Sequence, residues 1–490
     1  MGVSTKRSST ARGTPATSGP GVDPILGSVR YRVFAGLFGA FLGLSMLKFG
    51  NPPITEKWVT IPSNIYEFLL GYPWPINWGL GLLGMITVMG LFLLNWKSHA
   101  PRSLLALPLI WFGWQLLSAT QTVDAELTHA TLKHFAACVI CFYLGYFVLG
   151  HAQQLGWFWL GLICGLCLVL VVGWEQRFGG LEETRRYFFL YIYPGMKEVP
   201  PEYLKKMSSN RIFSTLFYPN ALAGVLLLLL PLTLGLIQSV SRYLTKPARG
   251  FLQFLMSIFA LGCLYWSQSK GGWLLMVLLG ILTLTRMPLG KRFKLALATG
   301  VLLMSLGGFF WKYSGFFKKG ATSVSARMDY WQAAWHTARS HIVFGTGPGT
   351  FFIPYMAIKR PESESARLVH NDYLEQASDS GLLGFLSYSA FIVYGLTWTF
   401  KQSQKVPRSD VSSMSETTRV QVPSGRTNAP VSKRQPEDWL FFGVWLGLLG
   451  WALQGLIEFG LYIPGSAWPA FSLFGWIIHR SCQPDPSHQS

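Results

Sequence analysis

Five ionisable residues lie close to the ends of long apolar segments, where their side chains could meet a ligand: Arg211, Lys270, Arg327, His370 and Glu458. Three cations that reach one surface can hold a diphosphate, because guanidinium groups bind phosphate oxygens through paired hydrogen bonds. An imidazole at the same surface can take up a proton near neutral pH and act as a general base. The simpler alternatives are phospholipid head-group binding for each cation and an inert surface position for the histidine.

His370 begins the sequence His370-Asn-Asp-Tyr-Leu-Glu375, which is typical of a helix start. Asn371 or Asp372 can cap this helix, because a short polar side chain accepts a hydrogen bond from a free backbone N–H of the first turn. The helix runs toward an apolar segment that begins at Gly381-Leu-Leu-Gly384. The pattern therefore holds His370 at a helix start beside the membrane surface.

The stretch that contains Arg327 has the spacing of an amphipathic helix. Its apolar residues recur at i, i+3 and i+4, and the resulting stripe should lie on the bilayer surface or against the helix bundle. These residues are Val324, Met328, Trp331, Trp335 and Ala338. Simple packing explains the stripe fully, and spacing alone does not decide whether Arg327 is a solvated or a functional charge.

A glycine-rich sequence, Gly345-Thr-Gly-Pro-Gly-Thr350, separates that helix from the histidine. It is not a nucleotide-binding loop, because no Gly-Lys-Ser/Thr follows it. We expect either a plain turn or a tight exposed turn in which the amides near Gly347 and Gly349 could bind an anion.

The composition identifies the elements that must position these residues. The chain of 490 residues is 50% hydrophobic and only 13% charged, whereas soluble proteins carry about twice that charged fraction. The apolar residues fall into blocks long enough to cross a bilayer as helices. The sequence thus predicts an all-α, polytopic integral membrane protein, and it excludes a single soluble domain, a disordered chain and a disulfide scaffold.

We predict about twelve transmembrane helices. They are expected near residues 33–49, 77–95, 104–119, 133–149, 156–173, 219–238, 250–266, 271–286, 294–311, 381–400, 438–457 and 466–480. The formal charge of +19 then reflects basic cytoplasmic segments rather than nucleic-acid binding, because no basic helix or aromatic-basic surface accompanies it. This rule places both termini in the cytoplasm and two long loops, 174–218 and 312–380, outside.

The remaining segments complete the expected organisation. Residues 1–32 and 481–490 are cytoplasmic tails, the first of them disordered, and 401–437 is a flexible cytoplasmic linker within a transmembrane domain that covers 33–480. Two Cys-x-x-Cys pairs, at 138/141 and 164/167, could form a four-sulfur metal site. Because both pairs lie inside spans, where thiolates are costly, we expect small apolar core residues and no metal.

The order of the motifs resembles the O-antigen ligase/polymerase family over about residues 205–480. The motifs are Arg211-Ile-Phe-Ser-Thr215 with Pro219-Asn220, the Ser267-Gln-Ser-Lys-Gly271 turn, Arg327-Met-Asp-Tyr-Trp331, Gly345–Phe351, and His370-Asn-Asp-Tyr-Leu374 with Gly381–Gly384. The resemblance implies a C-type glycosyltransferase-like architecture in the bacterial inner membrane. It implies transfer of a glycan from a polyprenyl-diphosphate carrier to a lipid or glycan acceptor on the periplasmic side, without metal or other cofactor.

The resemblance also implies roles for single residues. His370 would deprotonate the acceptor hydroxyl, and Arg211 and Lys270 would hold the diphosphate together with Arg327. Glu458 would support the site, and the family pattern adds further supporting positions. These are Asn371, Asp372, Tyr373, Gly347 and Gly349. The family commonly has arginine where this chain has Lys270, and lysine keeps the charge but loses the planar fork.

Two questions stay open at the level of sequence. The acceptor could be a lipid A core sugar, the growing glycan or a protein side chain. The alternative function is a membrane transporter for bicarbonate or another small solute, and a structural membrane partner with a degenerate site is a third reading. Exchangers and proton pumps place Asp, Glu or His near the membrane midplane, whereas polar residues there are mostly Ser, Thr and Gln such as Gln115 and Gln454, which weakens the transporter reading.

Overall fold

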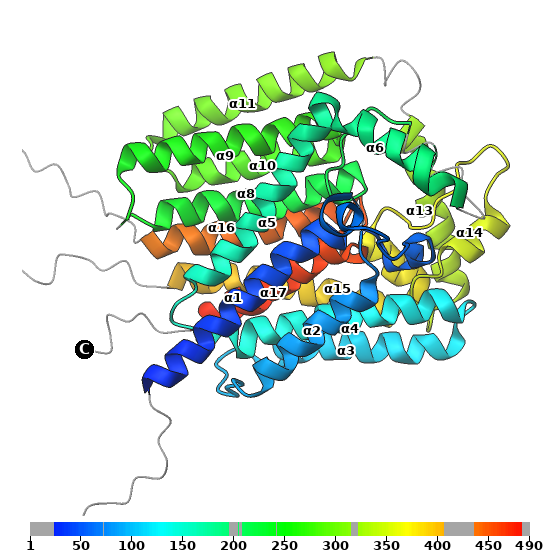
Figure 1. Ribbon diagram of the computed structural model, residues 1–490, viewed down its shortest axis with the longest axis horizontal. Helices are drawn as coiled ribbons and strands as arrows, with labels where there is room; N and C mark the ends of the chain where they lie inside the picture. The colour runs from blue at the N-terminus through cyan, green and yellow to red at the C-terminus, as the bar shows by residue number, and fades with distance from the viewer. Residues whose placement is uncertain are drawn as a thin grey trace, which may run out of the picture.

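The computed structural model shows a bundle of long helices with a cap of further helices at one end (Figure 1). Every regular element among the described residues is helical, so the all-α prediction is confirmed for that part of the chain. The structure describes residues 24–71, 73–195, 204, 208–241, 243–314, 322–405 and 436–482.

Within the described residues, the bundle contains eleven helices of 16 to 25 residues and one, α15, of 34. They are α1 (Pro24–Lys48), α2 (Ile76–Leu91), α3 (Arg102–Ser118), α4 (Ala125–Phe147), α5 (Gly156–Glu175), α8 (Pro219–Ser239), α9 (Lys246–Ser267), α10 (Lys270–Arg286), α11 (Lys291–Lys312), α15 (Asp372–Lys405), α16 (Pro436–Gln454) and α17 (Pro464–Arg480). The cap contains α6 (Leu181–Tyr187), α13 (Thr322–Ser340) and α14 (Phe352–Ile358).

Each of the twelve predicted spans is helical in the structure, but the helices differ in how well they suit a bilayer. Eight helical stretches among the described residues are long and apolar enough to cross a membrane, and α2 and α16 are shorter apolar helices. The other two, α10 and α17, have 17 residues each. Because α17 is buried from Pro464 to His479, protein rather than lipid surrounds it. The composition and length of these helices are those of an integral membrane protein.

Several predicted boundaries are wrong by a few residues. Helix α1 begins at Pro24 rather than near 33, α15 continues to Lys405 and α16 begins at Pro436, so parts of the predicted tail and linker are helical. The rest of both segments, 1–23 and 406–435, lies outside the described residues, as do 483–490 and parts of both long loops.

Glycines let two helices of the bundle approach closely. Gly39 and Gly43 of α1 meet Gly161 and Gly165 of α5, and a Cβ at Gly43 would lie 2.4 Å from the carbonyl oxygen of Gly161. Small residues four apart on both partners are a common means of packing membrane helices backbone to backbone. This contact fixes the position of α1, which leads into the end of the bundle where α13 and α14 lie.

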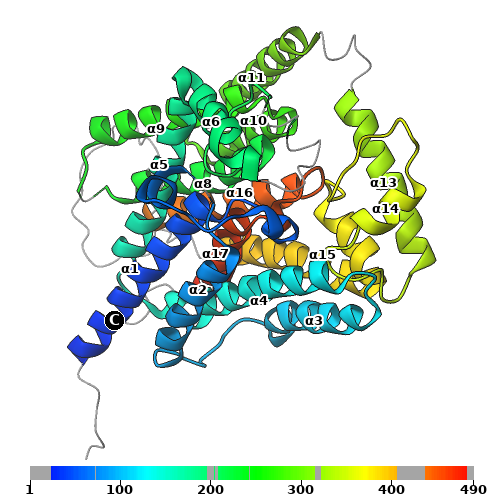
Figure 2. The same ribbon diagram turned by 45° about the vertical axis from the view of Figure 1, so that its right-hand side comes forward.

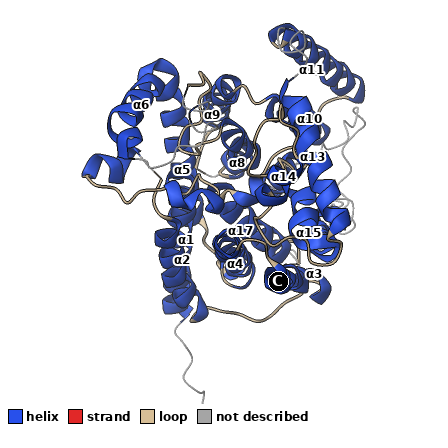
Figure 3. Ribbon diagram, turned by 90° about the vertical axis from the view of Figure 1, so that its right-hand side faces the viewer, coloured by secondary structure: helices blue, strands red, loops and turns tan. Residues whose placement is uncertain are grey.

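Helix α11 is the exception to this close packing. It contacts α10 and has no buried residue, and in Figures 1, 2 and 3 it lies at the edge of the bundle. The core instead lies between the pairs α8–α16, α1–α5, α4–α17 and α3–α15.

We predict that Gly43→Leu destabilises the protein by about 1–3 kcal/mol, because the larger side chain must push α1 and α5 apart. The matched control is Gly84→Leu on α2, where an added Cβ meets nothing within 4 Å. Thermal unfolding in detergent should show a lower midpoint for the first variant only. Equal losses in both variants would contradict the backbone contact described above.

Candidate active site

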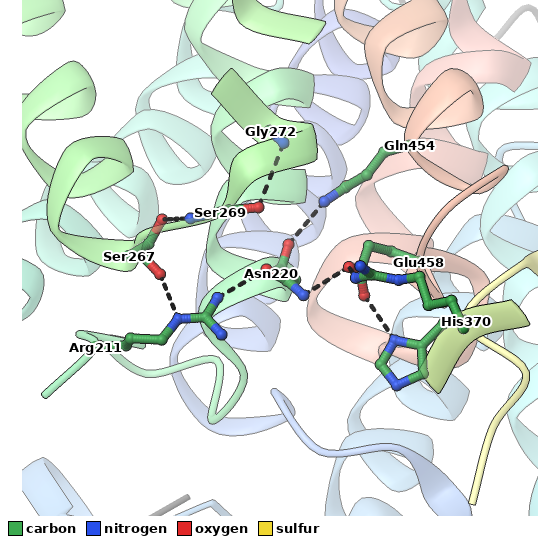
Figure 4. A network of polar contacts seen from close by, with 9 residues as sticks. Arg211, Asn220, Ser267, Ser269, Gly272, His370, Gln454 and Glu458 are labelled. Atoms are coloured by element: carbon green, nitrogen blue, oxygen red, sulfur yellow. Dashed lines mark hydrogen bonds and ion pairs between the residues drawn. The ribbon is translucent and has the colours of Figure 1, made fainter. Parts of the chain in front are cut away.

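The carboxylate of Glu458 is the centre of the polar network at the capped end of the bundle (Figure 4). Its Oε1 accepts hydrogen bonds from Asn220 Nδ2 at 2.6 Å and from Arg327 Nη2. Its Oε2 lies 3.0 Å from His370 Nδ1. The side chain is only 7% exposed, so these partners replace the water that a carboxylate would otherwise bind. Three predicted site residues therefore meet in one place.

The segment that carries Glu458 is held by the first turn of α15. Asp372 N donates to Gly455 O at 2.7 Å, and Asp372 Oδ2 accepts from Leu461 N at 3.0 Å. On the other side of this segment, His134 Nε2 lies 2.7 Å from Leu461 O. The prediction that Asn371 or Asp372 caps the helix is resolved here, because Asn371 Oδ1 accepts from Leu374 N at 3.0 Å. Asp372 is thus a supporting residue of the Glu458 segment.

His370 is tightly oriented. Its backbone is in the left-handed region with φ of 57°, a conformation that non-glycine residues adopt rarely and that concentrates at functional sites. The ring lies between Tyr330 and Phe459, with centroid distances of 5.8 and 4.7 Å. Figure 4 shows Nδ1 turned toward Glu458 and the second ring nitrogen, Nε2, turned away from it. The side chain is 27% exposed, so a ligand could reach Nε2.

Arg211 is fixed by two hydrogen bonds that orient its guanidinium. Nε donates to Ser267 O at 2.8 Å, and Nη2 donates to Asn220 Oδ1 at 3.0 Å. Asn220, at the start of α8, therefore links Arg211 to Glu458. The backbone carbonyl of Asn220 accepts a hydrogen bond from Gln454 Nε2 at 2.8 Å. Burial lowers the pKa of Arg211 while the nearby Glu458 carboxylate opposes this shift. An arginine remains protonated under such conditions.

Lys270 lies at the start of α10, beside the same network. Gln268 before it is left-handed with φ of 53°, and Ser269 caps the helix by accepting from Gly272 N at 3.3 Å. Burial lowers the pKa of Lys270, and the positive charges of Arg211 and Arg327 lower it further. Lys270 therefore lies close enough to both arginines for their charges to affect it.

The predicted helix around Arg327 is confirmed as α13. The spacing of its apolar residues did not show which face of the helix packs against the protein. In α13 the buried residues are Tyr330, Ala333, Ala334 and Thr337, whereas Val324, Met328 and Trp335 of the apolar stripe are 45–52% exposed. Arg327 faces Glu458, and its Nε is buried without a hydrogen-bond partner. The guanidinium therefore has donors left for a ligand.

The glycine-rich turn is buried and not exposed. Gly347 N donates to Asp379 O at 2.8 Å, and Gly349 N donates to Asp379 Oδ2 at 2.7 Å. Side chains of Thr122 and Thr131 fill the space where a Cβ would lie at the two glycines. The two glycine amides are thus already bonded within the protein, and the alternative of an exposed anion-binding turn is wrong. Gly347 and Gly349 support the fold beneath the site.

Tyr373 has a similar supporting place. Its Oη donates to Ala452 O at 3.0 Å, which joins α15 to α16 near the Glu458 segment. Sequence reasoning gave no site role to four contributors, Asn220, Ser267, Tyr330 and Gln454, although it named the first three within motifs. Their residue types do not indicate these roles. Ser267 acts through its backbone carbonyl, Tyr330 through its ring, and Asn220 and Gln454 through their amides, and each role depends on a contact with a distant segment.

No metal-binding group of three or more His, Cys, Asp or Glu residues occurs among the described residues. The Cys-x-x-Cys residues differ in burial, and the prediction of core positions is wrong for Cys164. Cys138 and Cys141 are buried in α4, while Cys164 is exposed on α5.

Part of the chain matches a known protein family. Residues 255–389 match the family described as O-antigen ligase, the family that the motifs indicated. The match includes Lys270, Arg327 and His370, whereas Arg211 and Glu458 lie outside it. No curated protein matches the chain. This partial match agrees with a membrane enzyme of the O-antigen ligase type and does not separate ligase from polymerase.

We predict that acid weakens the fold through Glu458. Burial raises the pKa of this carboxyl, but the charges of Arg327 and His370 outweigh burial and bring it below the ordinary value of 4.5. The carboxylate's stabilising contribution is therefore complete above that value and is lost as the pH falls through the lower, folded-state pKa. Between about pH 5 and about pH 3, the melting temperature of the parent should fall more steeply than that of Glu458→Gln.

The control for this measurement is Glu362→Gln, which changes an exposed carboxyl. It should keep the pH dependence of the parent. Parallel curves for the parent and Glu458→Gln would show that the Glu458 carboxylate does not contribute to stability through its charge.

Proposed function

We propose that this protein is a glycosyltransferase that moves a glycan from a polyprenyl-diphosphate carrier to an acceptor hydroxyl, without a metal ion. The observation that supports this most strongly is the shared contact of Arg327 and His370 with Glu458, extended through Asn220 to Arg211. It combines a candidate base and a candidate anion site within one network. The match of residues 255–389 to the O-antigen ligase family supports the same chemistry.

In this proposal the cations stabilise the leaving group. As the bond between the sugar and the diphosphate breaks, its electrons move to the phosphate oxygen, and fixed positive charges stabilise the developing negative charge. Arg211 is held in place by Ser267 and Asn220, and Lys270 adds a point charge. Because lysine cannot bind two oxygens through a fork, Arg327, with its unpaired Nε, takes the bidentate role.

His370 is the proposed general base. Its Nδ1–H donates to Glu458 at 3.0 Å, which leaves the lone pair of Nε2 free to accept the proton of the acceptor hydroxyl. The hydroxyl oxygen then forms the new bond to the anomeric carbon from the side opposite the diphosphate. Such a displacement inverts the anomeric centre. Glu458 acts as a positioning residue, since it holds the ring orientation and stabilises the imidazolium that forms.

We further propose that the site faces the periplasm of a bacterium and that both termini face the cytoplasm. In Figure 1, α1 begins and α17 ends toward the left, whereas α13 and α14 lie to the right. The basic segments Lys97–Arg102 and Arg242–Arg249 fall on the side of the termini in the predicted topology, as the distribution of charge in membrane proteins requires.

The acceptor separates the two family activities. Deletion in the native host, followed by gel analysis of surface glycans, distinguishes them. Loss of lipid-capped chains identifies a ligase, whereas short unpolymerised chains identify a polymerase. An unchanged glycan profile together with a defect in solute uptake would contradict the proposal and favour a transporter.

We predict that His370→Ala lowers glycan transfer by roughly 10²–10⁴, the usual contribution of a general base, while the protein remains in the membrane. The matched control is His341→Ala, because His341 is an exposed histidine that follows α13. Transfer is measured with purified enzyme and lipid-linked donor. A parental rate in the His370 variant would refute its role as the base.

We predict that Lys270→Gln raises the KM for the donor by about tenfold or more, because an ionic hydrogen bond to phosphate is lost. Lys270→Arg should retain affinity, since it keeps the charge. Lys294→Gln serves as the control, because Lys294 lies in the first turn of α11 and its Nζ donates to Thr285 O. Equal KM values for Lys270→Gln and the parent would exclude Lys270 from diphosphate binding.

A further inference from the structure

One side of α13 is apolar and is not covered by protein. Val324, Met328 and Trp335 are 45–52% exposed, and spacings of four and seven residues place them on the same side of the helix. Ile342 and Val343, which follow the helix, are 58% and 55% exposed. We call these five residues the α13 apolar face. Exposed apolar surface of this extent usually marks a contact with another molecule or with lipid.

Contacts with two predicted spans fix the level at which this face ends. Leu382 N, in the first turn of the span within α15, donates to Ile342 O at 2.8 Å. Phe344 stacks on Trp114, near the end of α3, with the ring centroids 5.3 Å apart and an angle of 7° between the ring planes. Both contacts lie where a span meets the membrane surface. Ile342 and its neighbour Val343 are therefore at the level of that surface.

The α13 apolar face is continuous with the lipid-facing side of α15. Leu382, Leu383 and Leu386 are exposed on that helix, and in a membrane span such side chains are covered by the acyl chains of the bilayer. Since Leu382 is hydrogen-bonded to Ile342, the lipid that covers the start of this span also reaches Ile342. Lipid is therefore the occupant that the neighbouring surface already requires.

The direction of α13 agrees with a position along the membrane surface. Figure 2 shows α13 at the edge of the capped end, where it crosses the direction of the long helices α3 and α15. A helix that crosses the ends of membrane spans runs along the surface of the bilayer. Amphipathic helices in this position keep their apolar side at the boundary between head groups and acyl chains.

The charge beside the apolar face is positive. Arg339 is exposed, and its guanidinium lies over the ring of Trp335, 4.7 Å from the centroid. Tryptophan rings favour the level of the lipid head groups, and a long basic side chain beside them can reach the lipid phosphates. From Tyr330 to Pro361 the sequence contains no Asp or Glu. No acidic side chain of this stretch therefore repels an anionic head group.

We infer that the α13 apolar face is seated in the surface of the bilayer, with its side chains among the acyl chains and Arg339 on the phosphate of an anionic phospholipid. Because the same helix brings Arg327 to Glu458, the lipid surface then helps to hold one side of the candidate site. The inference requires only that the bundle spans a membrane, and it does not depend on glycan transfer. Water and a second protein are the other possible occupants, and the experiment separates them from lipid.

The probe is phosphatidylglycerol with a photoreactive diazirine in the first part of an acyl chain. A small fraction of it is mixed into phosphatidylethanolamine vesicles that contain the full-length protein. We expect cross-links at Trp335, Ile342 and Val343, mapped by mass spectrometry, with Leu386 as the internal standard for a lipid-facing residue. Photoreactive phosphatidylcholine should label the three residues about fivefold less, relative to Leu386, because a basic residue near the membrane attracts anionic lipid by about this factor.

A pair of acidic variants tests the apolar contact. Val343→Asp should lower cross-linking of Trp335 by about tenfold relative to Leu386, a loss equivalent to about 1.4 kcal/mol, because an ionised carboxylate is excluded from acyl chains. The matched control is Ile358→Asp, which places the same acid at an exposed apolar position at the end of α14. It should leave the cross-linking of Trp335 unchanged.

A pair of arginine variants tests the head-group contact. Arg339→Gln should remove the preference for phosphatidylglycerol over phosphatidylcholine, because the charge beside the apolar face is lost. Arg360→Gln makes the same change at an exposed arginine after α14 and should keep the preference.

Two results would overturn the inference as a whole. The first is cross-linking at Leu386 with none at residues 335–343, which would leave the face to water or to a protein. The second is equal cross-linking in Val343→Asp and Ile358→Asp. A preference for phosphatidylglycerol that survives Arg339→Gln would overturn the head-group contact. Because the measurement records contact with lipid, it stands whether or not the protein transfers a glycan, so failure of the proposed function would leave a positive result intact.

Discussion

The arrangement at the capped end of the bundle depends on one buried carboxylate. Glu458 accepts from Asn220, Arg327 and His370, and an anion removed from water to this extent is stable only while such partners remain. The requirement works in both directions, because each partner is also oriented by the carboxylate. A single buried charge thereby determines where α8, α13 and the start of α15 meet.

The backbone near the site adopts two unfavourable conformations. His370 and Gln268 adopt left-handed conformations that are unfavourable for residues with a side chain. They persist because neighbouring contacts over-determine them, such as the cap at Ser269 and the rings on either side of His370. Hydrogen bonds of Leu461 with Asp372 and His134 hold the Glu458 segment in place. The network thus combines two strained backbone positions with a segment that is held firmly by hydrogen bonds.

Much of this arrangement could be predicted from sequence, and the remainder could not for identifiable reasons. Apolar blocks predicted the helices, and motif order brought Arg211, Lys270, Arg327, His370 and Glu458 together in advance. Residue spacing could not show that Gly347 and Gly349 are buried. The same turn sequence is compatible with amides that bind water and with amides that donate to a buried residue such as Asp379. It also could not reveal Asn220 as a bridge, because that role depends on contacts between residues more than 200 positions apart.

That bridge has an electrical consequence. Asn220 presents its carbonyl oxygen to Arg211 and its amino group to Glu458, so a neutral amide separates the two ions. In a direct pair, the carboxylate would cancel most of the guanidinium's field over short distances. With the amide between them, Arg211 is oriented by the network while the carboxylate weakens its field less than a direct ion pair would.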